Sequence, residues 1–356
     1  MSVVRRLFLS APYYQQAARR SSTSVEARVW TLKYKCRGLP KLSDFECKSE
    51  ILPPCDDGDV IIAAEWLSVD PYMRYRIAMS KPCDVIVGSQ VAKVIESRNA
   101  DIPVGSYVLA YPGWRSHARV SKQHTHNPST FTKLPDFGPI RRSAALGILG
   151  MTGNTAYFGF LELCSPKAGE TVVVNAAAGA VGSAVCQIAK IKGCRVVAFA
   201  GGARKCDYVR SLGVDEVHDY KSEDIGAVLK AAAPDGVNCY FDNVGGDFTA
   251  AVVPHMAEYG RISLCGTIST YNKQRGEQTA PPLDPGWLIP KQIRTEGFIV
   301  TRWAPRWMEG IGQLAQWIQE GKLKYNETVI EGFDNMPEAF IGLFRGDNIG
   351  KTVVQF

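Results

Sequence analysis

Apolar residues in the middle of the chain form short continuous runs that alternate with helical patterns. A strand buried on both faces of a sheet is apolar throughout, and parallel strands need helices to cross between them. Six such runs follow one another, the number that a complete doubly wound dinucleotide-binding sheet requires. We therefore predict an α/β domain of the Rossmann type, with strands at 171–175, 195–200, 214–220, 237–244, 261–266 and 294–300.

The region before this sheet has a different pattern, in which short β-like runs are broken by Gly and Pro. The clearest runs lie at 60–64, 85–94 and 106–110. Such punctuation favours a compact barrel-like unit over further layers of helix and sheet. A helical pattern at 311–320 then precedes a stretch, 325–356, that reads as β-rich. We expect this last stretch to return to the first domain.

These patterns divide the chain of 356 residues into two domains, because a single core of this length is uncommon. The composition, with 46% hydrophobic and 21% charged residues, is that of an ordinary globular protein. We expect a leader at 1–25, a β-barrel substrate domain formed by 26–150 together with 316–356, and a dinucleotide-binding domain at 151–315.

The formal net charge of +6 is concentrated at the start of the chain. Arg5, Arg6, Arg19 and Arg20 all precede Glu26, the first acidic residue, so the rest of the chain is close to neutral. This distribution predicts no nucleic-acid partner, which would need a basic face on the folded domain. The Arg-rich, Ser-rich leader is typical of a mitochondrial transit peptide, or else of a disordered terminus on a cytoplasmic protein. No segment is long and apolar enough to predict a membrane span.

Ten cysteines are scattered along the chain without a Cys-x-x-Cys pair. A structural zinc lobe needs closely spaced thiolates, so we expect reduced, mostly structural cysteines and no metal. His124 and His126 stand one residue apart, but no third ligand is adjacent. We interpret them as part of a solvated loop.

A dinucleotide fingerprint follows the first strand of the predicted sheet. The strand leads into AAAGAVG at 176–182, and a helical pattern continues to Lys192. The order of strand, tight turn and helix gives the motif its weight, because a glycine pair alone would equally suit a flexible loop. Gly179 would let the backbone approach a pyrophosphate, and Gly182 would let the helix pack on the strand.

The end of the second predicted strand distinguishes NADP from NAD. An NAD enzyme usually places an Asp or Glu here, for the ribose 2′-hydroxyl. This chain instead has Arg204 and Lys205 after two glycines and an alanine. Two cations without a carboxylate favour a 2′-phosphate; the alternative is that they only solvate a helix start, where cations oppose the helix dipole.

Several segments together resemble the prostaglandin reductase branch of the medium-chain dehydrogenase/reductase superfamily. The likeness runs from about Ala27 to the C-terminus and omits only the leader. The segments that carry it, besides the Ala-rich loop, are VDPYMR at 69–74, GNTAYFG at 153–159, FDNVGG at 241–246, CGTISTYN at 265–272, EGFIVTRW at 296–303 and GDNIGK at 346–351.

The resemblance implies a GroES-like barrel for the substrate domain, NADPH between the domains, no zinc, and a homodimer. Carried onto matching positions, the family's contacts to the pyrophosphate fall on Gly179, Ala180, Val181 and Gly182. Those around the 2′-phosphate fall on Lys205 and Tyr220. Those to the ribose and nicotinamide fall on Asn243, Cys265, Gly266, Thr267, Ile268, Ser269, Thr270, Tyr271, Phe298, Ile299, Val300 and Asn348.

The activity implied by the resemblance is reduction of the double bond of enones and enals, such as 15-oxo-prostaglandins and alkenals, with oxidation of a 12-hydroxy leukotriene as a further possibility. Without a metal, hydrogen-bond donors must stabilise the enolate oxygen that develops. We expect Tyr271 to be that donor and Tyr72 to form the opposite wall of the substrate slot. Either tyrosine could instead be a core residue with a polar tip.

Three alternatives remain open at this stage. An NADPH:quinone reductase of the same superfamily would share the fingerprint and the missing zinc ligands. A non-catalytic NADPH-binding protein would take up cofactor without turnover. A zinc alcohol dehydrogenase is disfavoured by the absent ligand pattern. The loop from Lys273 to Pro285, which we expect to shape the pocket, cannot be interpreted from composition.

Overall fold

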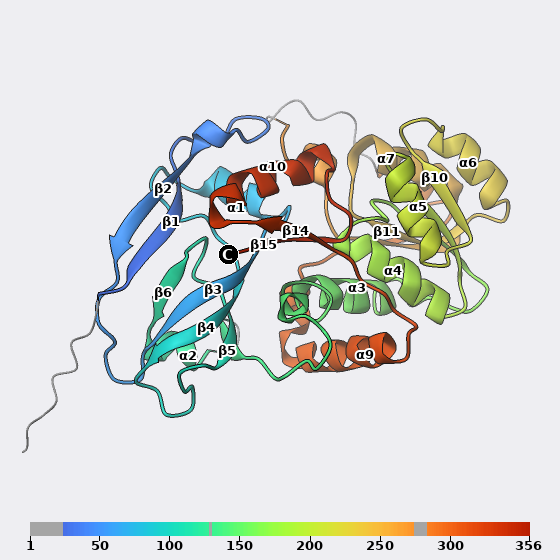
Figure 1. Ribbon diagram of the computed structural model, residues 1–356. Helices are drawn as coiled ribbons and strands as arrows, with labels where there is room; N and C mark the ends of the chain where they lie inside the picture. Colours follow the sequence, from blue (N-terminus) through green and yellow to red (C-terminus); the bar gives the residue numbers. More distant parts are fainter. Residues whose placement is uncertain (1–23, 128–129, 274–282) are drawn as a thin grey trace, which may run out of the picture.

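Two lobes lie side by side in the computed structural model, which describes residues 24–127, 130–273 and 283–356 (Figure 1). One lobe holds a parallel six-stranded sheet between helices, and the other is mostly antiparallel. The predicted leader lies almost wholly outside the described residues, as does most of the pocket loop expected between Lys273 and Pro285. The α/β sheet and the separate N-terminal β domain confirm the predicted fold class.

All six strands of the predicted parallel sheet are present, with their ends trimmed by up to three residues or, at one strand, extended. Their order is β10-β9-β8-β11-β12-β13, and every neighbouring pair is parallel. The direction of winding therefore reverses beside β8, which creates a crevice at the carboxyl ends of the strands. The strands are β8 (Thr171–Val174), β9 (Arg195–Ala200), β10 (Glu216–Asp219), β11 (Val237–Asp242), β12 (Met256–Leu264) and β13 (Arg294–Gly297).

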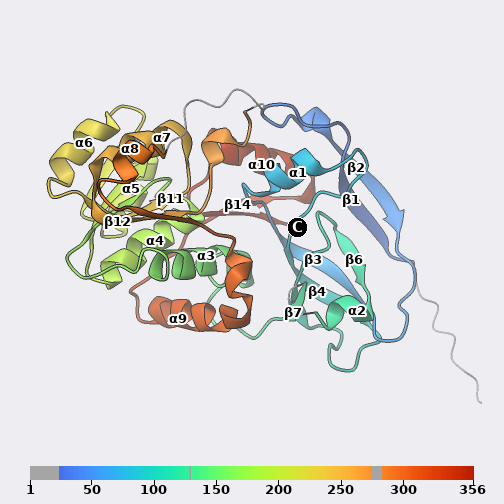
Figure 2. The same ribbon diagram turned by 180° about the vertical axis from the view of Figure 1, so that it is seen from behind.

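Helices cover both faces of this sheet, which explains why its strands are apolar throughout (Figures 1 and 2). Val172 and Val174 pack in one buried cluster with α3, α4 and α9, whereas Val173 packs on the other face with α6 and α7. No helix in the described residues is long and apolar enough to cross a bilayer. The helices of this lobe are α3 (Met151–Leu161), α4 (Ala180–Ile191), α5 (Ala203–Ser211), α6 (Ile225–Ala232), α7 (Gly246–Val252), α8 (Pro285–Leu288) and α9 (Trp307–Gln319).

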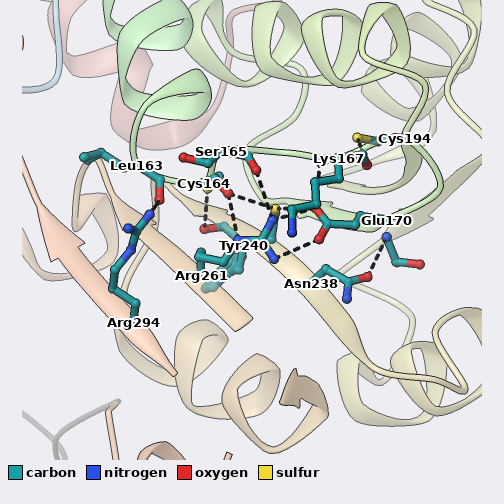
Figure 3. A network of polar contacts seen from close by, with 12 residues as sticks. Leu163, Cys164, Ser165, Lys167, Glu170, Cys194, Asn238, Tyr240, Arg261 and Arg294 are labelled. Atoms are coloured by element: carbon teal, nitrogen blue, oxygen red, sulfur yellow. Dashed lines mark hydrogen bonds and ion pairs between the residues drawn. The ribbon is translucent and has the colours of Figure 1, made fainter. Parts of the chain in front are cut away.

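A polar network fastens the amino-terminal edge of the sheet, opposite the crevice (Figure 3). Arg261 of β12 donates to both carboxylate oxygens of Glu170, at 3.0 and 2.5 Å, and to the carbonyl oxygen of Cys164 at 2.8 Å. Asn238 accepts a hydrogen bond from the N–H of Thr171 at 2.9 Å. The network therefore joins the start of β8 to β11, to β12 and to the end of α3.

The second lobe contains a seven-stranded sheet and a separate hairpin formed by β1 and β2. The path of the large sheet is β14-β15-β3-β4-β5-β7, and β6 pairs with β3. Apart from β14 and β15, its strand pairs are antiparallel. The strands are β1 (Glu26–Leu32), β2 (Phe45–Ile51), β3 (Val60–Ser68), β4 (Gln90–Ser97), β5 (Tyr107–Ala110), β6 (His117–Val120), β7 (Phe131–Lys133), β14 (Glu327–Glu331) and β15 (Lys351–Gln355).

The C-terminal stretch returns to this lobe as predicted, since β15 pairs with β3, but it is not all β. Helix α10 (Met336–Arg345) lies between β14 and β15, so the expectation of a β-rich stretch was wrong there. Pro337 stands in its first turn, and Gly346 ends it in the left-handed conformation at φ +76°. These are standard start and stop signals, and the buried Phe340 shows that tertiary packing stabilises the helix.

The remaining short elements lie at turns and domain connections. The run 85–94 was predicted as one strand, but only its second half belongs to β4, and Val85 forms an isolated bridge with Thr31. The short helices are α1 (Met73–Met79), α2 (Lys122–Thr125), η1 (Leu42–Asp44), η2 (Arg142–Leu146), η3 (Val253–His255), η4 (Ile268–Thr270), η5 (Val300–Arg306) and η6 (Phe333–Asn335).

The predicted domain boundary between 315 and 316 falls inside α9. Leu314 and Trp317, on either side of it, are both buried in the cluster that contains Val172 of the parallel sheet, and Leu323 joins the same cluster. A helix that packs as one unit on the sheet cannot be divided between two cores. We therefore propose that the parallel-sheet domain extends to Leu323 and that the β domain resumes after it.

Candidate active site

The first turn of α4 packs so closely against the loop after β8 that only glycine fits at position 182. A Cβ on Gly182 would lie 2.4 Å from the carbonyl oxygen of Ala176 and 2.9 Å from Cα of Ala177. Helix α4 begins at Ala180, and the N–H groups of its first turn have no partners within the helix. These groups and the helix dipole favour an anion. The residues predicted to hold a pyrophosphate lie at this turn: Gly179, Ala180, Val181 and Gly182.

The C-terminal segment of the chain lies against the same turn. The N–H of Gly350 donates to the carbonyl oxygen of Ala178 at 2.7 Å, and Gly350 forms a parallel bridge with Gly179. Asn348 is held beside it, because its side-chain amide donates to the carbonyl oxygen of Gly350 at 2.9 Å. The structure therefore brings Asn348 next to the phosphate loop, although more than 160 positions separate them in the sequence.

Cations gather where β9 and β10 end. A Cβ on Gly201 would lie 2.8 Å from the hydroxyl oxygen of Tyr220 and 3.0 Å from Cε of Lys221, so both side chains cover that glycine. Burial lowers the pKa of Lys205, and the charges of Lys221 and Arg204 lower it further. The Nζ atom of Lys205 also lies close to Gly346 of the C-terminal segment. Mutually repelling cations in one place form a site for a dianion such as a phosphate.

A buried aspartate organises the turn after β11. The carboxylate of Asp242, which is 1% exposed, accepts hydrogen bonds from the side-chain amide of Asn175 at 2.8 Å and from the N–H groups of Val244 and Gly245 at 2.9 Å. Asn175 in turn accepts from the N–H of Asn243 at 2.7 Å. The network joins the end of β8 to the turn that carries Asn243, so the phosphate loop and the predicted ribose contact have fixed relative positions.

The loop that follows β12 lies against the Asn243 turn. The N–H groups of Cys265 and Gly266 both donate to the carbonyl oxygen of Asp242. Downstream, the N–H of Ser269 donates to the carbonyl oxygen of Val244 at 3.1 Å. The residues predicted to contact the ribose and nicotinamide therefore lie on one loop beside the Asn243 turn; they are Cys265, Gly266, Thr267, Ile268, Ser269, Thr270 and Tyr271.

Tyr271 ends the short helix η4, and its hydroxyl oxygen lies over Gly266, 3.3 Å from where a Cβ would be. Burial raises the pKa of Tyr271, so the phenol keeps its proton at neutral pH and can donate a hydrogen bond. Burial and the nearby Asp242 raise the pKa of Cys265 to about 12, which makes this thiol a poor nucleophile. Of the two polar side chains, the tyrosine is the one suited to act on a substrate.

The predicted contacts at 298–300 point in different directions. The ring of Phe298 covers Gly159 and packs with Phe241 and Trp303, at centroid distances of 6.3 and 5.4 Å. Val300 is buried, whereas Ile299 is 74% exposed. The main-chain N–H and C=O groups are therefore what this segment offers to a nicotinamide carboxamide.

Tyr72 lies in the β domain at the start of α1, near a second tyrosine that the sequence did not single out. Burial raises the pKa of Tyr72 above its ordinary value, with Asp70 and Tyr111 adding to the effect. Burial and Asp70 also raise the pKa of Tyr111 to about 12. Both phenols therefore stay protonated. Both tyrosines lie near the buried Asp70 in the β domain.

A single contact shows that the segments of the two predicted tyrosines meet. Arg74, two residues after Tyr72, donates from Nε to the side-chain oxygen of Asn272 at 3.0 Å. Asn272 directly follows Tyr271. Segments from the two lobes that each carry a predicted substrate-slot tyrosine are therefore in contact.

Comparisons with known proteins agree with this arrangement. Residues 28–127 match the model for the N-terminal domain of oxidoreductase, and residues 180–317 match that for zinc-binding dehydrogenase. Prostaglandin reductase 1 of Oryctolagus cuniculus is 48% identical over 330 residues, which cover 92% of this chain and 93% of that protein. The chain belongs to the prostaglandin reductase family.

Other members of this broader group are also similar over nearly their whole lengths. The NADP(+)-dependent 2-alkenal reductase of Nicotiana tabacum is 42% identical, with 91% of this chain and 95% of that protein covered. The crystal structure of CurA from Vibrio vulnificus in complex with NADPH superposes with a TM-score of 0.85 at 38% identity, covering 92% of this chain and 98% of that one. This chain and the CurA structure thus have the same fold over nearly their whole lengths.

One of the matching family models is named for zinc binding, so we searched this chain for metal ligands. Across 24–127, 130–273 and 283–356, no group of three or more His, Cys, Asp or Glu side chains could hold a metal ion. His124 and His126 bond to Ser121 and to the carbonyl oxygen of Lys122, within and beside the exposed helix α2. That no metal takes part in the reaction stays a prediction.

Three residues of the site were missed in the sequence. Lys221 follows Tyr220 directly, and a cation at the end of the third strand was a usable signal. Asp242 stands within the FDNVGG segment, but its role depends on a distant partner, Asn175. Tyr111 lies in a loop with no local feature that distinguishes it.

Proposed function

We propose that this chain uses NADPH to reduce the carbon–carbon double bond of α,β-unsaturated ketones and aldehydes, including 15-oxo-prostaglandins and alkenals. One observation carries the proposal. Lys205 and Lys221 lie near Gly201 at the end of β9, where an NAD enzyme would have a carboxylate, and the protonated Tyr271 lies on the loop after β12 with its hydroxyl over Gly266. The names of the relatives, prostaglandin reductase 1 and 2-alkenal reductase, support the same class of reaction.

The residues of the crevice fit NADPH along its length. The free N–H groups at the start of α4 suit the pyrophosphate, and close packing leaves no room for a side chain at Gly182. Lys205, Tyr220 and Lys221 surround a space suited to the 2′-phosphate. Hydrogen bonds hold Asn243 beside Asn175 and Asn348 beside Gly350, and we expect these two asparagines to contact the ribose and nicotinamide part. When bound, NADPH supplies the hydride that adds to the β-carbon of the substrate.

Tyr271 has the chemistry that the transition state needs. As the β-carbon is reduced, negative charge develops on the carbonyl oxygen of the enone. A phenol O–H directed at that oxygen stabilises the charge, and its burial strengthens the interaction by excluding water. Its raised pKa keeps the proton on the phenol oxygen when substrate binds.

Tyr72 and Tyr111 would line the opposite side of the slot. Aromatic rings supply flat apolar area for an extended, conjugated substrate, and their hydroxyls remain available for a polar group. Both phenols stay neutral because burial raises the pKa of each. They therefore add no charge that would repel a carboxylate-bearing substrate such as a prostaglandin.

A substrate panel monitored by NADPH absorbance tests the proposal. We expect turnover with an alkenal and a 15-oxo-prostaglandin to exceed that with an ortho-quinone. Faster quinone turnover would instead identify a quinone reductase, and NADPH uptake without turnover on any compound would identify a binding protein. Reverse assays with NADP and a 12-hydroxy leukotriene test the oxidation, and a parallel series with a chelator tests the predicted independence from metal.

We further propose that the chain forms a homodimer through the open edge of the parallel sheet. Among the described residues, strand β13 pairs only with β12, which leaves its outer main-chain groups free for another strand. Ile299, directly beyond this strand, is 74% exposed. Light scattering on the purified chain should give twice the mass of one copy, and the mass of a single copy would contradict the proposal.

The proposed location is the mitochondrial matrix or the cytoplasm. The basic, acid-free composition of 1–25 supports the first, and the expectation from the family supports the second. Microscopy of the full chain and of a chain lacking 1–25 decides between them. Mitochondrial signal only in the full chain would assign the leader as a transit peptide.

A further inference from the structure

Arg74 is a buried cation whose partners are neutral. It is 5% exposed, and besides Asn272 it donates from Nη2 to the carbonyl oxygen of Gly38 at 2.9 Å. No carboxylate forms an ion pair with it among the residues that the structure describes. Burying a charge without a counter-charge is costly. A purely structural role in the β domain would be served as well by a neutral side chain.

The bond from Arg74 to Asn272 joins the two lobes at one particular place. Its ends are 198 positions apart in the sequence. On one side it lies two residues beyond Tyr72, and on the other it lies one residue beyond Tyr271. The same contact therefore fixes the distance between the segments that carry both walls of the substrate slot.

The turn that carries Tyr271 is anchored on its other side by the dinucleotide domain. Ile268 and Ser269 donate to the main-chain oxygens of Asn243 and Val244, at 3.4 and 3.1 Å. Asn272 is the point at which the same turn is held from the β domain. Without that second anchor, the turn could shift relative to Tyr72 while remaining attached to the cofactor side.

We propose that Arg74 and Asn272 are a positioning pair that holds the Tyr271 turn against the β domain and so sets the phenol for the carbonyl oxygen of the substrate. This inference rests on the function proposed above for Tyr271. Neither residue touches the reacting atoms in this account. The pair acts by holding Tyr271 in place. It can do so only while the two lobes are packed together as in this structure, because the bond runs from one lobe to the other.

The decisive measurement is the rate of hydride transfer in a single turnover, followed by the absorbance of bound NADPH on mixing with an alkenal. Steady-state rates also contain product release, which an opened cleft could accelerate. A displacement of the donor by about 1 Å can slow a reaction by about 100-fold. We expect Asn272→Ala and Arg74→Lys each to slow hydride transfer by at least about 10-fold, while the Kd for NADPH stays within about 2-fold.

Three further variants separate positioning from simple loss of stability. Asn272→Asp keeps an acceptor for Arg74 and should retain most of the rate. Lys192→Ala removes an exposed lysine at the carboxyl end of α4, outside the proposed site, and should have no effect. Because both singles lose the same bond, the double variant Arg74→Lys with Asn272→Ala should be no slower than the slower single. Thermal unfolding of every variant, measured in parallel, shows whether the fold is kept.

Tyr271→Phe makes failure of this inference distinguishable from failure of the function proposed for Tyr271. If Tyr271→Phe slows hydride transfer but a folded Asn272→Ala does not, the positioning pair is wrong and the role of Tyr271 stands. If Tyr271→Phe has no effect, the proposed role of the tyrosine fails, and the positioning pair fails with it. A folded Asn272→Asp as slow as Asn272→Ala would also overturn the pair, because an acceptor would then not suffice.

Discussion

At the scale of single residues, the candidate site depends on protonation states that burial fixes. Tyr72, Tyr111 and Tyr271 all have a raised pKa, so each presents an O–H rather than a phenolate. Lys205 has a lowered pKa because it is buried beside other cations. A bound 2′-phosphate would reverse this effect by supplying the missing negative charge. The effect of a substitution on the reaction rate can therefore be predicted from the phenol of Tyr271. Its effect on the choice of cofactor can be predicted from the ammonium group of Lys205.

Tyr271→Phe should slow enone reduction and leave NADPH binding nearly unchanged. The substitution removes only the hydroxyl, and loss of one preorganised donor to an oxyanion costs on the order of 100-fold in rate. Steady-state kinetics with an alkenal should show a lower kcat, with a Kd for NADPH equal to that of the parent by fluorescence titration. An unchanged kcat would remove this tyrosine from the mechanism.

Lys205→Ala and Lys221→Ala should each reduce the preference for NADPH over NADH. A hydrogen bond to a charged group contributes about 1.5–3 kcal/mol, so each ratio of kcat/KM values should fall by about 10-fold or more. Only the NADPH value should change, because NADH lacks the phosphate.

Lys192→Ala is the matched control for these two variants. Lys192 is an exposed lysine at the opposite end of α4, and its removal should leave the ratio unaltered. Equal losses for both cofactors in Lys205→Ala would contradict its assignment to the phosphate. An unchanged ratio in Lys221→Ala would limit the cradle to Lys205 and Tyr220.

At the scale of elements, the two ends of the parallel sheet do different work. The carboxyl ends of β8, β9, β11 and β12 lead into the loops of the crevice, where backbone approach and polar turns dominate. The amino ends are fastened by Glu170 and Arg261, far from that chemistry (Figure 3). A substitution at the amino-terminal edge should therefore change the stability of the fold without directly changing the loops at the carboxyl ends of the strands.

Glu170→Gln should destabilise the fold in a pH-dependent manner. Burial by itself raises the pKa of Glu170, but hydrogen bonds from Arg261 and from the N–H of Lys167 outweigh it, and the net shift is downward. Folding thus favours the carboxylate. The stabilisation is fully present above the unfolded-state pKa of about 4.3 and is lost as the pH falls through the lower folded-state pKa.

Urea unfolding at two pH values checks the prediction for Glu170. At pH 7 the variant should be less stable than the parent by about 1.5–3 kcal/mol, the usual contribution of a hydrogen bond to a charged group. The gap should narrow at pH 3. A gap that widens on acidification would show that the sign of the pKa shift is wrong, and normal NADPH binding in the folded variant would confirm that the crevice is independent.

At the scale of the whole molecule, β15 connects the two lobes. Its first residue, Lys351, donates to the carboxylate of Asp70 at 2.9 Å and to the carbonyl oxygen of Val69 at 2.7 Å. The preceding Gly350 bonds to the phosphate loop. Both Asp70 and Lys351 are no more than 5% exposed. This buried ion pair therefore holds the substrate wall and the dinucleotide turn on one short segment.

Lys351→Met should destabilise the molecule strongly, because Asp70 would remain buried and, within the described part of the chain, would keep only the hydroxyl of Ser68 as a side-chain partner. Removal of one member of a buried ion pair typically costs about 3–5 kcal/mol. The double variant Asp70→Asn with Lys351→Met, in which no charge is left unpaired, should recover part of that loss in urea unfolding. A single variant as stable as the parent would show that the pair contributes nothing net.

The sequence by itself determined the features that have a local cause. Apolar runs that must be covered on both faces gave the six parallel strands. The close approach at Gly182 gave the phosphate turn, and the cations after β9 gave the expectation of NADP. Helix α10 could have been found in the same way from Pro337 and Gly346, but its short amphipathic pattern was read as strand. Each of these features depends on residues within a turn or two of one another.

Only the tertiary structure decided which distant residues meet. Asn175 with Asp242, Asp70 with Lys351, and Arg74 with Asn272 are pairs separated by tens to hundreds of positions, and the residues between them leave no periodic trace of the contact. A hydrogen bond across the crevice depends on how two separately folded cores pack together. That packing is set by the sum of many apolar contacts, and no single residue of the chain reports it.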